Sequence, residues 1–271
     1  MITHKEVTDL LKLTMLIYNY GKEITDSNQD SIIYRREKVV ELNDVRLEAY
    51  NELCEESPEG SVVKFINDIE TDLQAAITIS HRHRRISVIF RGTESFSDWY
   101  YNLIIFKIWI LDKVYVHRGF YKQLTKNNAY EDLSSTLKSL LIEYPDYKIY
   151  VCGHSLGSSL ASLFGFMISH EIENHITVIS YAGPRVGDYR WKREVLEKTN
   201  LDYYRVTNEN DIVTSIPLIG YKHVGTVIHL TPKKLILDRI YGWYSYTLFK
   251  CRSIAAHSCE LYYQRLINYP W

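Results

Sequence analysis

The sequence predicts an α/β fold, in which a mostly parallel central sheet carries helices on both of its faces. Short segments rich in β-branched and aromatic residues alternate along the chain with segments whose apolar residues recur at helical spacing. The composition is that of a globular protein, with 46% hydrophobic and 24% charged residues. A chain of 271 residues can bury a large core, and we expect residues 1–271 to form a single domain.

The pattern assigns most of the individual elements in order. A first helix is expected over residues 3–20, because its apolar residues form one stripe and Gly21 offers a stop. Residues 22–50 are mixed and receive no assignment. Strands are predicted at 62–66, 73–80, 86–90, 148–152, 176–181, 203–207 and 226–230. Helices are predicted at 120–143, at 158–168 and after residue 257.

Five basic residues, His81-Arg82-His83-Arg84-Arg85, separate two of the predicted strands. We interpret them as a solvated hairpin turn, and an anion-binding or nucleic-acid-binding patch is the alternative. A metal site is disfavoured because the two histidines have no further ligands nearby. The net charge of −1 argues against nucleic acid as the main partner, and no apolar run reaches the ~18 residues that span a bilayer.

The first residues contain no basic segment followed by an apolar one, and the chain has no Asn-x-Ser/Thr sequon. These features predict an intracellular, cytoplasmic protein, with peripheral membrane contact allowed. The cysteines Cys54, Cys152, Cys251 and Cys259 form no C-x-x-C pair, and we expect all four to be thiols. A disulfide between Cys251 and Cys259 is the alternative.

The segment Gly153-His154-Ser155-Leu156-Gly157 fits G-x-S-x-G, a motif in which a serine sits on a tight turn between a strand and a helix. The five letters alone are weak evidence, but the strand predicted before them and the helix predicted after them supply the context. Catalytic groups of parallel sheets lie at the carboxyl ends of strands, where Ser155 is placed. We therefore take Ser155 as the candidate nucleophile; an incidental serine in a plain strand–turn–helix is the alternative.

A serine nucleophile needs a histidine base, and the histidine needs a carboxylate. With this motif the acid and then the histidine follow the serine. The later acids include Asp188, Asp202, Glu209, Asp211 and Asp238. Asp211 fits best because it lies in a polar turn just past a predicted strand, and a turn-closing role is the alternative. Among His223, His229 and His257 we favour His257, whose small neighbours leave its ring room, whereas His229 lies in a strand-like run.

Acyl transfer also needs hydrogen-bond donors for the oxyanion of its transition state. The backbone N–H of Leu156, the residue after the serine, is one candidate. Thr93 is the second, because it follows the strand predicted at 86–90 and offers both an amide and a hydroxyl. This chemistry requires no metal and no organic cofactor.

These motifs resemble those of the class 3 lipases, the fungal triacylglycerol lipase family. The resemblance rests on Phe90-Arg91-Gly92-Thr93, on the motif around Ser155, on Asn208-Glu209-Asn210-Asp211-Ile212-Val213 and on the late His257. The matching motifs run in order from about residue 62 to residue 263. The chain departs from well-known members, which are secreted and disulfide-bonded, and its segment 233–252 is unlike the usual loop before the histidine.

The resemblance implies an α/β-hydrolase fold in which Ser155, Asp211 and His257 form a catalytic triad. It also implies that Thr93 and Leu156 form the oxyanion hole. The resemblance also assigns His223 to a structural motif, so that His223 no longer competes with His257 as the candidate base.

An almost wholly apolar segment covers residues 99–111. The resemblance implies a lid over the site here, and an amphipathic flap can cover an apolar cleft in water and then lie on a lipid surface. A buried helix or strand is the alternative. The residues expected to contact substrate are Trp99, Leu103, Ile104, Phe106 and Trp109, and residues 241–246 are a candidate second wall.

We therefore predict a serine carboxylic-ester hydrolase, a lipase that cleaves acylglycerol or related lipid esters through an acyl-enzyme. Its expected partners are a lipid or acyl-ester substrate and, transiently, a membrane or lipid-droplet surface, with no nucleic acid and no obligate protein partner. A phospholipase or acyltransferase with the same triad is one alternative. A non-catalytic scaffold that binds lipid or protein is another.

Overall fold

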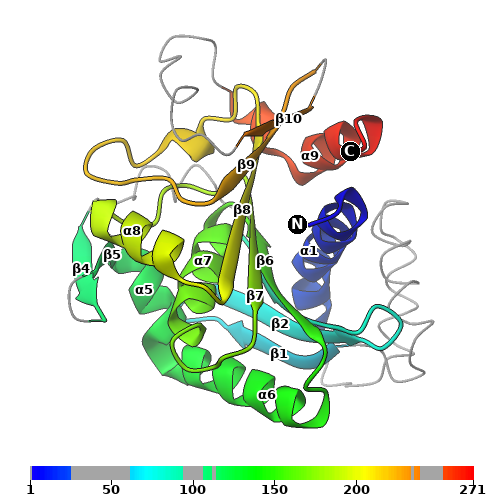
Figure 1. Ribbon diagram of the computed structural model, residues 1–271, viewed down its shortest axis with the longest axis vertical. Helices are drawn as coiled ribbons and strands as arrows, with labels where there is room; N and C mark the ends of the chain where they lie inside the picture. The colour runs from blue at the N-terminus through cyan, green and yellow to red at the C-terminus, as the bar shows by residue number, and fades with distance from the viewer. Residues whose placement is uncertain (1, 26–61, 94–105, 112–113, 233–234, 239–252) are drawn as a thin grey trace.

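A computed structural model describes residues 2–25, 62–93, 106–111, 114–232, 235–238 and 253–271 (Figure 1). Several predictions fall outside these ranges. They concern the lid residues Trp99, Leu103 and Ile104, the second wall at 241–246, and the cysteines Cys54 and Cys251.

The described strands build one eight-stranded sheet and a separate two-stranded hairpin. The large sheet has the order β1-β2-β3-β6-β7-β8-β9-β10. Its strands are β1 Val62–Asp68, β2 Leu73–Ser80, β3 Arg85–Phe90, β6 Lys148–His154, β7 Ile176–Tyr181, β8 Leu201–Asn208, β9 Thr226–Leu230 and β10 Leu235–Asp238. The hairpin pairs β4 Lys107–Ile110 with β5 Val114–His117. Every strand predicted from the sequence is present, whereas β4, β5 and β10 were not assigned.

The five strands from β3 to β9 in the large sheet run parallel to one another, and antiparallel strands lie at both edges. The helices are α1 His4–Thr25, α5 Arg118–Thr125, α6 Ala129–Glu143, α7 Leu156–Ile168, α8 Tyr189–Glu197 and α9 Cys259–Asn268. Figure 1 shows α1 and α9 on one side of the sheet and α5 to α8 on the other. The α/β class with a mostly parallel sheet is thus confirmed.

Strand alternation divides the buried side chains between two cores, one on each face of the sheet. On β6, Ile149 and Val151 pack with the core under α6 and α7, while Tyr150 and Cys152 pack with the core under α1 and α9. Both faces of the central strands are therefore apolar, as expected for parallel strands covered by helices on both sides. Cys152 and Cys259 are buried. Because Cys251 lies outside the described residues, the alternative disulfide between Cys251 and Cys259 stays a prediction.

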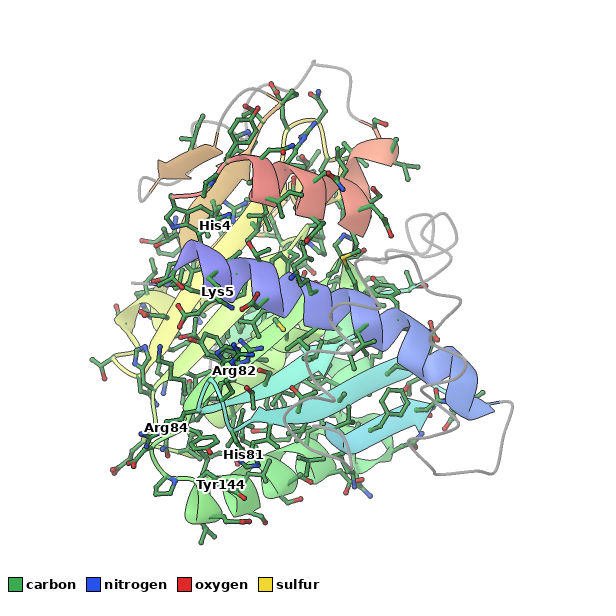
Figure 2. The ribbon with its side chains drawn as sticks, turned by 90° about the vertical axis from the view of Figure 1, so that its right-hand side faces the viewer. His4, Lys5, His81, Arg82, Arg84 and Tyr144 are labelled. Atoms are coloured by element: carbon green, nitrogen blue, oxygen red, sulfur yellow. The ribbon has the colours of Figure 1, made fainter. Side chains whose placement is uncertain are left out.

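The basic run forms the tight turn between the antiparallel strands β2 and β3, which confirms the hairpin. Figure 2 shows His81, Arg82 and Arg84 gathered at this turn, with Tyr144 from the end of α6 close to them. Arg84 lies 3.2 Å from Asp146 in an exposed ion pair. Arg85 was wrongly placed in the solvated turn: it is the first residue of β3 and is buried.

Two helix boundaries differ from the prediction. The expected helix at 120–143 is broken, because Asn127 and Asn128 adopt positive φ values of 54° and 60° between α5 and α6. Asparagine tolerates this left-handed conformation better than most residues do. The expected stop at Gly21 was wrong as well, since α1 continues to Thr25. A single glycine costs a helix only about 1 kcal/mol, which neighbouring contacts can offset.

The two helices α1 and α9, from opposite ends of the described chain, pack against each other. The His4 side chain makes a 2.8 Å hydrogen bond to the carbonyl oxygen of Leu266, and its ring meets the Trp271 ring edge-on at 4.8 Å. This helix pair covers the face of the sheet opposite α6 and α7, and both helices reach the site described next.

Candidate active site

Ser155 occupies the turn between β6 and α7, with φ 58° and ψ −126°. This backbone conformation is rare for a residue with a Cβ atom, and such strain clusters at functional sites. Two hydrogen bonds hold the turn: the Ser155 N–H donates to the Tyr181 carbonyl at 3.0 Å, and the Ser158 N–H donates to the Ser155 carbonyl at 3.1 Å. The serine predicted to lie on a strand–helix turn is therefore found there.

The turn is possible because α7 begins directly against the end of β3. A Cβ atom on Gly157 would lie against the Phe90 carbonyl oxygen and 2.7 Å from the Arg91 carbonyl oxygen. Real Cβ atoms do not approach backbone this closely, so only glycine lets the first turn of α7 pack there. The glycine that completes the motif thus positions Ser155 next to the Arg91-Gly92-Thr93 segment.

Asp211 and His257 form a buried carboxylate–imidazole pair. The His257 Nδ1 atom lies 3.0 Å from Asp211 Oδ2 and 3.1 Å from Asp211 Oδ1. Asp211 follows β8 at the carboxyl edge of the sheet, and His257 ends the short 3-10 helix Ala255–His257. The carboxylate accepts from Nδ1, so Nε2 is the ring nitrogen left to exchange a proton with a nucleophile.

The sequence did not predict the part that Tyr262 plays in this pair. Its hydroxyl donates to Asp211 Oδ2 at 2.7 Å and accepts from the Asn208 N–H at 2.9 Å. The Val213 N–H donates to Asp211 Oδ1 at 2.9 Å, so three donors surround the buried carboxylate. Burial, and next the negative charge of Asp211, raise the pKa of Tyr262 well above its usual value, so its proton stays on the hydroxyl.

His257 lies directly beside the serine turn. Its ring packs against the ring of His154, the residue before Ser155, with a centroid distance of 4.7 Å. Its carbonyl oxygen is 2.8 Å from His154 Nε2. Ser155 is 2% exposed and His257 is 6% exposed, so both side chains are buried. The Ser155 Oγ atom makes no hydrogen bond to any residue that the structure describes. Bonds between a nucleophile and its base often tighten only when substrate is present.

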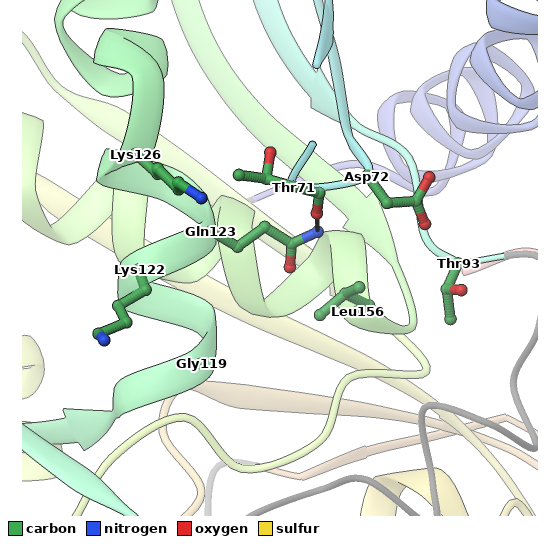
Figure 3. Close-up of a pocket in the computed structure, with 8 residues that line it drawn as sticks. All are labelled: Thr71, Asp72, Thr93, Gly119, Lys122, Gln123, Lys126 and Leu156. Carbon is green, nitrogen blue, oxygen red and sulfur yellow. Dashed lines mark hydrogen bonds between the residues drawn. The ribbon is translucent and has the colours of Figure 1, made fainter. Parts of the chain in front are cut away.

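The two expected oxyanion donors line one pocket of about 440 Å³. Figure 3 shows Thr93 and Leu156 on its walls, together with Asp72 and residues of α5. On α5, Gln123 donates to the Thr71 carbonyl at 2.9 Å and thereby fixes this wall. The backbone after Ser155 and the backbone after β3 therefore face a common space.

The other candidate histidines lie elsewhere in the fold. His229, on β9, makes a 2.9 Å hydrogen bond to the Thr207 hydroxyl. Burial lowers the pKa of His223 well below its usual value, and that of His229 as well. The hydrogen bonds of the Asp211 carboxylate are instead to His257, to Tyr262 and to the Val213 N–H.

Only the last part of the predicted lid lies in the described residues. Phe106 and Trp109 belong to it and are exposed, and β4 pairs with β5 instead of forming a helix. Across the described ranges, no group of three or more His, Cys, Asp or Glu side chains could hold a metal ion. No helix in those ranges is long and apolar enough to cross a membrane.

Comparisons with known proteins place this arrangement in a family. A family model described as lipase (class 3) matches residues 87–221. The lipase of Rhizomucor miehei is 26% identical over 186 residues, which cover 66% of this chain and 50% of that protein. The secreted mono- and diacylglycerol lipase A of Penicillium cyclopium is 26% identical over 179 residues, which cover 62% of this chain and 55% of that protein. The chain thus spans about half the length of the curated relatives it matches.

A solved structure of the Rhizomucor miehei triacylglyceride lipase has the same fold. It superposes with a TM-score of 0.74 at 22% identity, over 93% of this chain and 92% of that one. The large, mostly parallel sheet, the Ser155 turn at its carboxyl edge and the covering helices therefore form an α/β-hydrolase fold.

The predicted intracellular location is contradicted by these relatives, because the Penicillium enzyme is a secreted protein. The prediction was wrong because it rested on signals that were not found in this sequence, and such an absence does not determine where a protein acts. The family match contains Thr93, Ser155 and Asp211 and ends before His257. With the fold, the Ser155 turn and the matched segment in agreement, the chain belongs to the class 3 lipase family.

Proposed function

We propose that this protein is a serine carboxylic-ester hydrolase, a lipase that cleaves acylglycerol or related lipid esters. The observation that carries the proposal is the buried Asp211–His257 pair, whose imidazole packs against His154, the residue before a serine on a strained strand–helix turn. A lone serine hydroxyl is a poor nucleophile at neutral pH, and a carboxylate-oriented imidazole beside it supplies the base that it needs. Metal ions have no part in this proposal.

The reaction would follow the usual course of acyl transfer. The Ser155 Oγ attacks the ester carbonyl carbon while His257 Nε2 takes the hydroxyl proton. The N–H groups of Thr93 and Leu156 donate to the oxyanion. The tetrahedral intermediate collapses, His257 returns the proton to the leaving alcohol, and an acyl-Ser155 ester remains. Water then attacks this ester by the same steps and releases the acid. Asp211 keeps its charge throughout and stabilises the imidazolium.

A lipid surface is the proposed place of action, because large apolar side chains are exposed on adjoining loops. Phe106 and Trp109, at the β4 hairpin, are 61% and 53% exposed, and Ile219 is 82% exposed. The Lys107 Nζ donates to the Gly220 carbonyl at 2.6 Å and ties the hairpin to the loop that carries Ile219. Exposure of apolar surface to water costs about 25 cal/mol per Å² of accessible area. Contact of these side chains with lipid would remove that cost.

The first experiment is labelling of purified protein with a fluorophosphonate probe, beside Ser155→Ala and His257→Ala. We expect the parent to be labelled and both variants to lose labelling, because loss of a triad member costs on the order of 10⁴- to 10⁶-fold in rate. The assay is repeated with detergent micelles, which offer a lipid-like interface.

A panel of acylglycerols, phospholipids and short-chain esters then identifies the substrate. Faster cleavage of phospholipids than of acylglycerols would favour the phospholipase alternative, which uses the same residues. A parent protein that stays unlabelled with micelles and hydrolyses no ester would contradict the proposal and favour a non-catalytic scaffold.

A further inference from the structure

A chain of three hydrogen bonds connects helix α1 to both halves of the candidate site. The Gly92 N–H donates to the Tyr18 hydroxyl oxygen at 3.1 Å. The Tyr18 hydroxyl lies 3.2 Å from His154 Nδ1. The His154 Nε2 atom lies 2.8 Å from the carbonyl oxygen of His257. Tyr18 comes from the first helix, which lies outside the segment matched by the family model.

The partners allow one arrangement of protons in this chain. A carbonyl oxygen can only accept, so His154 Nε2 carries the proton that it donates to His257. Burial, and next the nearby His257, lower the pKa of His154 well below its usual value, so its ring is neutral and Nδ1 is bare. Nδ1 therefore accepts from the Tyr18 hydroxyl, whose oxygen in turn accepts from the Gly92 N–H. Each donor in the chain meets one acceptor.

The first of these three hydrogen bonds holds the loop that precedes Thr93. The bond to Tyr18 orients the peptide group between Arg91 and Gly92, and this sets the direction of the next N–H group, that of Thr93. The fit is close: a Cβ atom on Gly92 would lie against the Tyr18 hydroxyl and 2.6 Å from the His154 carbonyl oxygen. A small shift of this peptide would move the Thr93 donor.

The last of these three hydrogen bonds holds the backbone of His257. That residue ends a 3-10 helix of three residues, a short element with few bonds of its own. The bond from His154 holds the His257 carbonyl, and the two rings pack against each other at an interplanar angle of 39°, which restricts the imidazole. The positions of His257 and of the loop before Thr93 thus both depend on the buried side chain of His154.

We infer that Tyr18 is a positioning residue for the proposed ester hydrolysis. Its hydroxyl holds the loop before Thr93 directly, and it holds His257 through His154, so that the two keep their relative positions. The inference rests on the proposed function. It makes helix α1 part of the catalytic apparatus and not only a cover for the sheet. Misplacement of reacting groups by about 1 Å can cost a hundredfold in rate, so a bond that keeps them in place is visible in kcat.

The test compares Tyr18→Phe with the parent on a soluble short-chain ester. The variant removes one oxygen and keeps the ring. We expect kcat to fall about tenfold and KM to stay within about twofold, because the donors and the base act on the transition state more than on bound substrate. Fluorophosphonate labelling should persist at a slower rate, since Ser155 itself is unchanged.

The matched control is Tyr150→Phe. Tyr150 lies on the same strand as His154, and its hydroxyl donates to Glu6 of the same helix α1 at 2.5 Å. This control also loses a bond between strand and helix, but at a distance from the site, and its kcat should stay within about twofold of the parent. A tenfold fall in kcat for both variants would mean that loosening of α1 is the cause, and would overturn the inference.

A second variant tests the route through His154. His154→Leu removes both the donor to the His257 carbonyl and the acceptor for Tyr18. We expect Tyr18→Phe to cost less than about twofold in kcat in this background, because the bond that it breaks is already absent. If the two substitutions lower kcat independently, so that their fold-changes multiply in the double variant, the connection through His154 is contradicted. A Tyr18→Phe enzyme with the kcat of the parent would also contradict it. A parent that is neither labelled nor active would instead overturn the proposed function, and with it this inference.

Discussion

Removal of the Tyr262 hydroxyl should destabilise the protein and slow its reaction. In Tyr262→Phe, the buried Asp211 carboxylate loses its 2.7 Å donor and keeps those from His257 and Val213. The buried Asn208 N–H loses the acceptor that the same hydroxyl provides at 2.9 Å. The phenylalanine ring needs no partner of its own, so the cost lies in these two groups.

The magnitude follows from the charge on the acceptor. A hydrogen bond to a charged group contributes about 1.5 to 3 kcal/mol, roughly twice a neutral one. With the amide left unsatisfied as well, we expect the free energy of unfolding to fall by about 2.5 kcal/mol. A protein of 271 residues unfolds with an entropy of roughly 0.57 kcal/mol per kelvin, so Tm should fall by about 4 °C.

Thermal unfolding monitored by circular dichroism measures this shift, and ester hydrolysis measures the loss of His257 orientation, which we expect to be about tenfold in kcat. The control is Tyr263→Phe, which changes the next residue of α9, also buried, whose hydroxyl is not among the partners of Asp211. A Tm within about 1 °C of the parent for Tyr262→Phe would refute the reasoning, because the bond would then contribute nothing beyond what water supplies to the unfolded chain.

Two further predictions concern pH and lipid surfaces. Burial alone would raise the pKa of Glu6, but hydrogen bonds from Tyr150, Lys148 and Thr3 outweigh it and lower the pKa to about 2. The ionised form of Glu6 therefore stabilises the fold at pH values above about 4.5, and this contribution disappears as the pH falls towards 2. The free energies of unfolding of Glu6→Gln and the parent, measured in urea, should differ at pH 7 and converge near pH 2. Trp109→Ser should lower the rate on emulsified acylglycerol several-fold and leave a soluble ester unaffected, because less apolar surface meets the lipid; equal losses on both substrates would contradict a surface role.

The position of Ser155 could be predicted because its signal is local. A strand, five residues and a helix contain all that the turn needs, and the glycines mark where backbones touch. The strands of the central sheet were predictable for the same reason, since their alternation is visible within a few residues. Asp211 could be proposed because the acid of such a site follows the end of a later strand.

Tyr262, Tyr18 and His154 could not be assigned in this way. Tyr262 reaches Asp211 only because α9 turns back over the sheet, and Tyr18 reaches His154 across 136 positions of sequence. Tyrosine is common in this chain, with 23 residues, so no composition signal separates these two from the rest. Contacts between distant helices depend on how the layers pack, which periodicity along one segment does not describe.

The long separations within the site also order events during synthesis. His257 is made 103 residues after the His154 that it contacts and 46 residues after Asp211. At about 5 to 20 residues per second, a growing chain spends roughly 5 to 20 s with its serine turn made and its histidine not yet made. Until then α1 lies without α9, and Ser155 lacks its proposed base. An enzyme assembled in this order would be catalytically silent while it is still being translated, and would gain activity only when helices α1 and α9 come together.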